Sequence, residues 1–130
     1  PKSSAVYTAL SVRKKTGIVD AHSPLAKLRT PRRIAMLHYA PIAGTVKGEP
    51  VEIYPFLGSS RLEEPLLLFP VDVVCHGHAH RGSLEGRTLG GVPVYNVARP
   101  LLLRARPDEP PFRLLELARD PHIAIGEPSA

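Results

Sequence analysis

The feature that most constrains this chain is an apolar run that ends in three alternating histidines. Its sequence is Val71-Asp72-Val73-Val74-Cys75-His76-Gly77-His78-Ala79-His80. The first half has the length and β-branched composition of a buried strand. Along an extended chain, side chains at alternate positions project from the same side, so the three imidazoles are expected to lie together. Three of the six histidines fall within this stretch, and imidazole is a common metal ligand, so the pattern predicts a metal site at the end of a strand.

The length of the chain limits how this site can be housed. A chain of 130 residues has room for one domain with a single core. Its 15 prolines and 10 glycines predict abundant loops and short helices. A single cysteine rules out an internal disulfide, and no apolar run is long enough to span a membrane. We therefore expect a cytoplasmic protein without membrane partners.

Positive charge is concentrated at the start of the chain. Residues 1–33 carry eight lysines and arginines against one acidic residue, whereas the remainder carries nine basic and eleven acidic residues. We interpret residues 1–31 as a basic, loop-rich leader. Such a segment can bind nucleic acid or another anionic partner, but without interleaved aromatic residues a solvated segment is the more common outcome.

The order of the expected elements indicates an α/β fold. Residues 33–38 and 71–75 read as strands, and the Ser-x-x-Glu spacing from Ser60 predicts a short or distorted helix over residues 60–69. A strand, helix and strand in succession predict a parallel pair with a crossover helix. Because sites form beyond the carboxyl ends of parallel strands, His38 is expected close to the histidine cluster.

The remaining segments are expected to be short strands and loops. Residues 41–60 predict a long loop with Tyr54 and Phe56 as candidate groove residues, and Asn96 is expected to hydrogen-bond loop backbone. The other expected elements are a brief strand at 16–23, a short helix near 24–29, a hairpin of strands 83–88 and 92–97, and a last strand at 112–117.

Three segments together carry a resemblance to a known family. They are Leu37-His38-Tyr39-Ala40-Pro41, the Gly-His-x-His element from Gly77 to His80, and Val94-Tyr95-Asn96-Val97-Ala98. They resemble the carboxyl half of the calcineurin-like metallophosphoesterases over about residues 32–98. The resemblance implies part of an αββα sandwich with a mixed sheet, short helices and long loops. The domain would occupy residues 32–119, followed by a tail at 120–130.

The resemblance also implies a ligand set and a reaction. His38 and His78 would bind one divalent metal and His80 a second, with Mn, Fe or Zn as the ions. His76 matches no obligatory ligand, so it is a weaker candidate. The reaction would be hydrolysis of a phosphomonoester or phosphodiester by a metal-bound hydroxide, which requires no side-chain nucleophile. Cys75 is accordingly expected to be buried and inert.

The early motifs of the family are incomplete in this chain. Asp20-Ala21-His22 has the composition of the family's D-x-H element, but G-D-x-x-D and G-N-H-D/E are absent. Asp20 and His22 are therefore weaker ligand candidates. We expect the carboxyl-terminal half of a domain that is incomplete alone, needs an amino-terminal half or a second chain, and self-associates through an exposed sheet edge.

Two other functions remain open from the sequence. One is a mononuclear zinc site formed by His38, His78 and either His80 or His76. The other is a non-enzymatic module that binds anionic partners through the basic leader. Tyr39 and Arg81 are candidates for contact with a phosphoester substrate, although Arg81 can equally be a solvated side chain.

Overall fold

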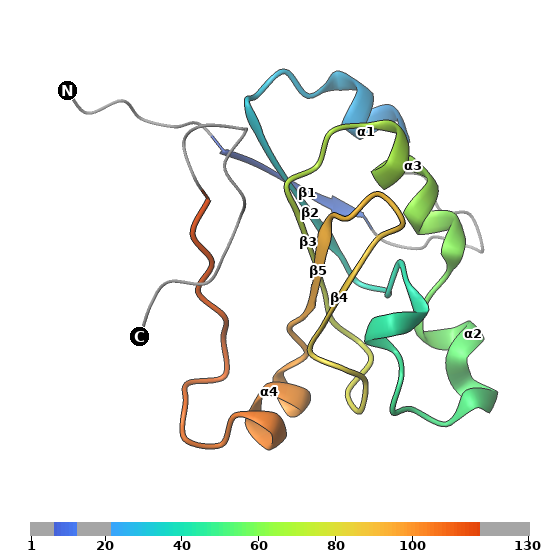
Figure 1. Cartoon of the computed structure of the whole chain (residues 1–130), viewed down its shortest axis with the longest axis vertical. Coiled ribbons are helices and arrows are strands. Elements are labelled where there is room, and N and C mark those ends of the chain that lie inside the picture. The colour runs from blue at the N-terminus through green and yellow to red at the C-terminus, as the bar shows by residue number, and fades with distance from the viewer. Residues whose placement is uncertain (1–6, 13–21, 118–130) are drawn as a thin grey trace.

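The computed structural model describes residues 7–12 and 22–117. They form an α/β arrangement around one five-stranded sheet with strand order β1-β2-β3-β5-β4 (Figure 1). The strands are β1 (Tyr7–Val12), β2 (Arg32–Leu37), β3 (Val73–His76), β4 (Glu85–Arg87) and β5 (Pro93–Asn96). The predicted α/β class is therefore confirmed.

The sheet is mixed, and its register aligns the ends of the central strands. β1, β2, β3 and β5 run parallel, while β4 pairs antiparallel with β5 as the predicted hairpin. Leu37 pairs with His76, which in turn pairs with Asn96, so the last residues of three strands lie side by side. At the opposite end of the same strands, Arg32 and Asp72 form an ion pair of 2.7 Å.

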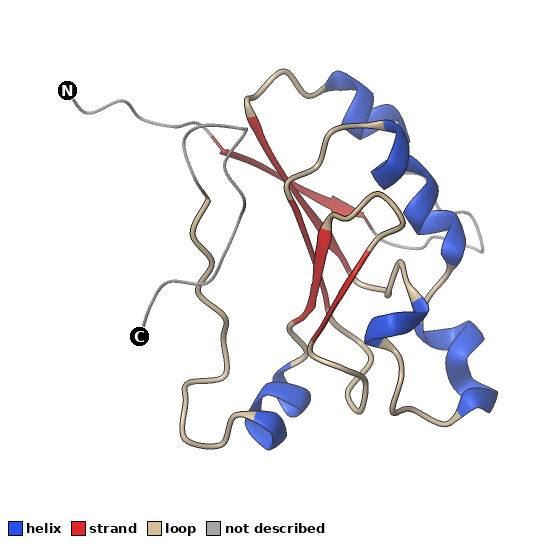
Figure 2. Ribbon diagram, viewed as in Figure 1, coloured by secondary structure: helices blue, strands red, loops and turns tan. Residues whose placement is uncertain are grey.

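Helices cover one face of the sheet (Figure 2). They are α1 (His22–Lys27) and α3 (Glu63–Leu68), the latter preceded by the 3₁₀ turn η3 (Ser60–Leu62). Alternate strand positions point towards them, as the pleat requires. The resulting core contains Leu25, Ala35, Leu37, Leu62, Leu66, Val71, Val74 and Val94.

The other face of the sheet carries a different set of side chains. Arg113, from the segment after the last helix, lies 5.0 Å over the ring of Tyr95 and 3.7 Å from the Glu85 carboxylate. Burial raises the pKa of the Cys75 thiol, with the Arg113 charge acting in the opposite direction. Cys75 is half-buried rather than buried as expected, and its lack of reactivity stays a prediction.

The segment predicted as a long loop is folded. It contains the 3₁₀ turns η1 (Ala43–Thr45) and η2 (Val51–Ile53) and the short helix α2 (Tyr54–Leu57). Ala40, Val46, Leu57 and Ala79 form a second apolar cluster against which Tyr54 packs, and we call it the minor core. The prediction failed because prolines and glycines here set turns that bury a few apolar side chains rather than leaving the chain open.

The predicted helix after this segment is short and irregular, as expected, but its cap differs. Ser59, rather than Ser60, is the N-cap of η3, and its hydroxyl accepts a hydrogen bond from the Arg61 amide at 3.3 Å. Glu63 does not close a capping box; instead its carboxylate accepts a hydrogen bond from the Leu89 amide at 3.1 Å. This bond ties the start of α3 to the hairpin turn.

Other expectations need correction. The leader is expected to be loop, yet residues 7–12 form β1. Its parallel pairing with β2 stabilises a strand that the residue pattern of the leader does not predict. The strand expected at 16–23 lies mostly outside the described residues, and its last two residues belong to α1. Residues 112–117 form no regular strand, and α4 (Arg99–Ala105) follows β5 where no element was predicted.

Among residues 7–12 and 22–117, no helix has the length and apolar composition needed to cross a membrane.

Candidate functional site

The carboxyl ends of β2 and β3 bring two histidines together. His38 directly follows β2, and His78 lies in the loop that follows β3. Their ring centroids are 4.7 Å apart with an interplanar angle of 38°. The predicted convergence of His38 with the histidine cluster is confirmed, and its cause is the parallel pairing of the two strands. Their role as metal ligands stays a prediction.

Tyr39 packs against both of these imidazoles. Its ring centroid lies 4.7 Å from that of His38 and 5.0 Å from that of His78, in edge-to-face arrangements at 89° and 77°. Edge-to-face contacts of this kind restrict how the rings rotate. The side chain expected to meet substrate is thus placed beside the histidine pair.

The backbone at His78 is unusual. Its φ is 69°, which is the left-handed region that L-residues with a side chain rarely adopt. The expectation that His76, His78 and His80 share one side of a strand is therefore wrong, because β3 ends at His76 and the chain turns at His78. Nε2 of His78 lies 3.1 Å from the Phe56 carbonyl oxygen, which can only accept. Nε2 then carries the proton, and the lone pair on Nδ1 remains for a ligand.

His76 is held in a different environment. It is 1% exposed, Nδ1 lies 2.8 Å from the Gly77 carbonyl oxygen, and Nε2 lies 2.6 Å from the Thr45 hydroxyl oxygen. Burial lowers the pKa of His76 from 6.5 to about 4, while the hydrogen bond to Gly77 acts in the opposite direction. Both ring nitrogens are engaged within the protein, which corresponds to a packing role rather than ligation.

Asn96 and Thr45 support the loop that carries the other two histidines. The Asn96 amide donates to the carbonyl oxygens of Ala79 at 2.8 Å and Thr45 at 3.2 Å, and its own oxygen accepts from the Ala98 amide. Gly82 completes the contact, because a Cβ there would collide with the Thr45 carbonyl oxygen. The predicted backbone-bonding role of Asn96 is confirmed. Thr45 was missed, and its position in a loop-like stretch offered no signal in the sequence.

The third candidate histidine lies apart. The His80 side chain is exposed, and its backbone carbonyl oxygen accepts from the Arg104 guanidinium at 3.1 Å. The Arg81 backbone amide donates to the Glu49 carboxylate at 2.6 Å, while its side chain is exposed. Within the described residues, no three side chains of His, Cys, Asp or Glu are grouped closely enough to hold a metal ion.

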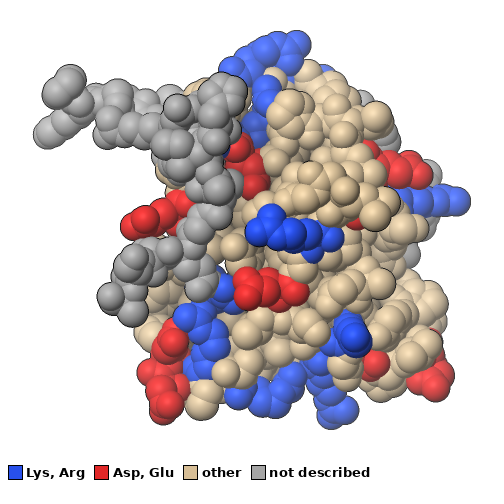
Figure 3. Space-filling model, in the orientation of Figure 1, with Lys and Arg blue, Asp and Glu red and all other residues tan. Residues whose placement is uncertain are grey.

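The side chains of the early ligand candidates, Asp20 and His22, are not described by the structure. Asp20 lies outside the described residues, and His22 is the first residue of α1, where only its backbone is described. Four of the six lysines and arginines of the leader are likewise outside the described residues, namely Lys2, Arg13, Lys14 and Lys15. On the face of the molecule in Figure 3, basic and acidic side chains are interspersed rather than gathered by sign.

Comparisons of the chain with family models, with curated proteins and with solved structures found no match.

Proposed function

We propose that this chain belongs to a metal-dependent phosphoesterase, as the carboxyl-terminal part of a metallophosphoesterase-like sandwich in which the described sheet is one layer. The observation that carries the proposal is the pairing of His38 with His78, whose ring centroids lie 4.7 Å apart beyond the ends of neighbouring parallel strands. Convergent imidazoles at such an edge suit a divalent cation.

The donor chemistry fits a cation such as Zn, Mn or Fe, but the number of ligands is too small. His38 is exposed and His78 is half-buried, so both can be reached from solvent. Two imidazoles alone do not complete a tetrahedral or octahedral shell. The proposal therefore requires further ligands. The candidates within this chain are Asp20, which lies outside the described residues, and His80, which does not group with the pair in this structure.

The residues themselves would bind and orient. His78 would offer Nδ1, because its hydrogen bond to the Phe56 carbonyl fixes the proton on Nε2. Tyr39 would hold both rings and form a wall beside the substrate phosphate. A bound cation supplies a hydroxide nucleophile and charge neutralisation for phosphoryl transfer. The substrate would be a phosphomonoester or a phosphodiester.

Zinc binding tests the site before any activity is needed. Titration calorimetry with Zn²⁺ should give an affinity that falls at least about tenfold in His38→Ala and in His78→Ala. His122→Ala, which removes a histidine outside the three family-like segments, should leave the affinity unchanged. Equal affinities in the wild type and both variants, or no binding at all, would contradict the proposal.

Hydrolysis tests the reaction separately. With Mn²⁺ present, the chain supplemented with any partner that completes the site should hydrolyse p-nitrophenyl phosphate or its bis ester, and a chelator should abolish the rate. One bound metal per chain with loss of affinity in His80→Ala would instead favour a mononuclear three-histidine site. Metal binding without hydrolysis of either ester would remove the phosphoesterase assignment.

A further inference from the structure

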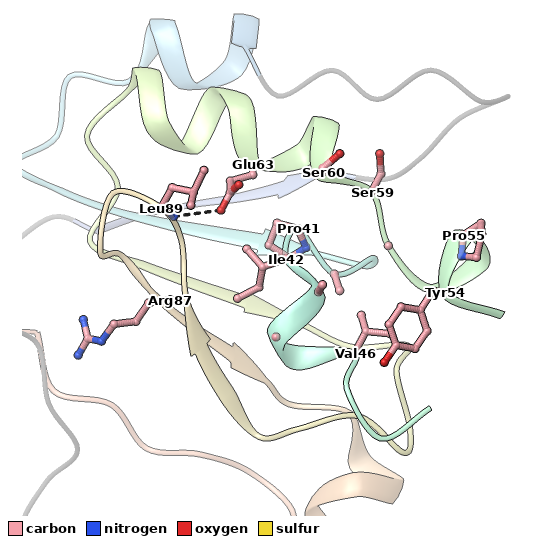
Figure 4. Close-up of a pocket in the computed structure, with 14 residues that line it drawn as sticks. Pro41, Ile42, Val46, Tyr54, Pro55, Ser59, Ser60, Glu63, Arg87 and Leu89 are labelled. Carbon is pink, nitrogen blue, oxygen red and sulfur yellow. Dashed lines mark hydrogen bonds between the residues drawn. The ribbon is translucent and has the colours of Figure 1, made fainter. Parts of the chain in front are cut away.

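A second candidate site is lined by none of the histidines. It is an open hollow of about 520 Å³ bordered by three segments of the chain (Figure 4). One wall is formed by Pro41 and Ile42 with η1, a second by Tyr54 and Pro55 of α2, and the rim by Glu63 and Leu89. This volume lies within the range of about 300 to 1,000 Å³ that is typical of small-molecule pockets.

Backbone hydrogen bonds and close backbone packing hold the walls of this hollow in place. The Ala40 amide donates to the Leu57 carbonyl oxygen and the Ser59 amide donates to the Ala40 carbonyl oxygen, both at 3.0 Å. Gly58 lies so close to Ala40 that a Cβ would collide with its carbonyl oxygen. Val46, at the base, is buried in the minor core. A hollow with walls held in this way is formed before a ligand arrives, which lowers the entropic cost of binding.

One polar group gives the hollow a preferred ligand chemistry. Glu63 is half-buried, and its Oε2 accepts from the Leu89 amide at 3.1 Å, which holds the carboxylate at the rim. Figure 4 places this carboxylate on the side of Pro41 and Ile42, whereas the Arg87 side chain extends away from the hollow. A carboxylate retains further acceptor positions after one hydrogen bond, and a donor group of a ligand can use them.

We propose that this hollow binds a small, mainly apolar molecule, such as a hydrophobic amine, whose N–H group donates to Glu63. The apolar body would displace water from Ile42, Val46 and Tyr54, and the single N–H would fix its orientation. The site uses none of the histidines, so it stands whether or not the proposed phosphoesterase function holds.

The test uses the full chain and N-phenyl-1-naphthylamine, an apolar fluorescent dye with one N–H donor. Its emission should rise on binding and saturate at one dye per chain. Ala43→Phe, which adds a ring at an exposed position of the lining, should weaken binding by at least about tenfold. Ala105→Phe adds the same ring at an exposed position of α4 and should bind as the wild type does. Similar affinities in the two variants would overturn the site.

The polar half of the proposal has its own test. Glu63→Gln keeps the shape and an acceptor for the Leu89 amide but loses the charge that strengthens the bond to the ligand N–H. It should weaken dye binding by about threefold or more. 1-Phenoxynaphthalene, which has an ether oxygen in place of the N–H, should lose no affinity in Glu63→Gln, because an ether oxygen cannot donate to the carboxylate. An equal loss for both compounds would assign the effect to the shape of the hollow and overturn the role of Glu63. If Glu63→Gln binds the dye as tightly as the wild type, Glu63 is not the acceptor and the assigned ligand chemistry is wrong.

Discussion

The Thr45 hydroxyl oxygen lies 2.6 Å from Nε2 of His76, in a fully buried contact between residues 31 positions apart. The other ring nitrogen of His76 faces the Gly77 carbonyl oxygen, which can only accept, so Nδ1 carries the proton. Nε2 must then accept from the Thr45 hydroxyl. The hydrogen bond to Gly77 thus fixes the tautomer of His76, and the hydrogen bond from Thr45 joins η1 to the end of β3.

Replacing Thr45 with valine should therefore lower the free energy of unfolding by more than the small change in side-chain volume suggests. Thr45→Val keeps the volume but leaves Nε2 of His76 buried without a donor, which should cost about 2 to 3 kcal/mol. Thr45→Ser retains the hydroxyl and loses only a methyl group, at about 1 kcal/mol. Urea unfolding of both variants measures the difference. If Thr45→Val is as stable as Thr45→Ser, the hydroxyl does not donate to His76.

The lowered pKa of His76 predicts a loss of stability in mild acid. Below pH 6.5 the His76 imidazole takes up a proton in the unfolded chain, whereas in the folded chain it stays neutral down to about pH 4. The contribution of His76 is complete above pH 6.5 and decreases as the pH falls, by about 2 kcal/mol between pH 7 and pH 5. Urea unfolding in the presence of a chelator measures it. A His76→Gln variant should show a smaller difference between the two pH values, and an unchanged difference would assign the effect to other groups.

The strands that local pattern could predict are those with apolar runs bounded by turn residues. β2, β3 and the β4–β5 hairpin were found in this way. β1 was missed because Tyr7–Val12 sits in a basic, irregular stretch, and its order comes from pairing with β2. α4 was missed although Pro100 is at its first turn, a position where proline favours helix initiation. For β1 the deciding information is the tertiary pairing with β2, and for α4 it is carried by the single residue Pro100.

The candidate site was predictable only in its coarse placement. The rule for parallel sheets put His38 near the histidine cluster, and the structure agrees. The rule of alternation failed for His78, because it assumes that the strand continues and His78 has a φ of 69°. The hydrogen bond from Thr45 to His76 could not be foreseen, since nothing in the sequence connects η1 to β3.

A substitution of Asn96 that keeps the shape of the side chain should still destabilise the protein. Asn96→Asp removes the amide group that donates to Thr45 and Ala79 and places a charge where the side chain has 0% exposure. The variant should lose about 3 kcal/mol or more of stability at pH 7. Asp108→Asn makes the reverse change at an exposed position and should stay within about 0.5 kcal/mol. Thermal or urea unfolding compares the two. A small loss in Asn96→Asp would mean that neither carbonyl depends on the Asn96 amide.

The left-handed backbone at His78 predicts opposite effects of glycine at two neighbouring histidines. At His78, glycine relieves the Cβ strain that alanine retains, so His78→Gly should be more stable than His78→Ala by about 1 kcal/mol. His80 is not among the positive-φ residues of the described chain, so His80→Gly should be less stable than His80→Ala by about 0.5 to 1 kcal/mol.

Comparing glycine with alanine at the same site removes the contribution of the lost imidazole, which both variants share. Urea unfolding of the four variants therefore isolates the backbone. The proposed zinc affinity should be equally low in His78→Gly and His78→Ala, because both lack Nδ1. If alanine is the more stable residue at both positions, His78 is not held in the left-handed region, and its ring need not face His38. His78 would then carry no backbone strain, and there would be no reason to infer that the loop gives up stability in order to place this imidazole.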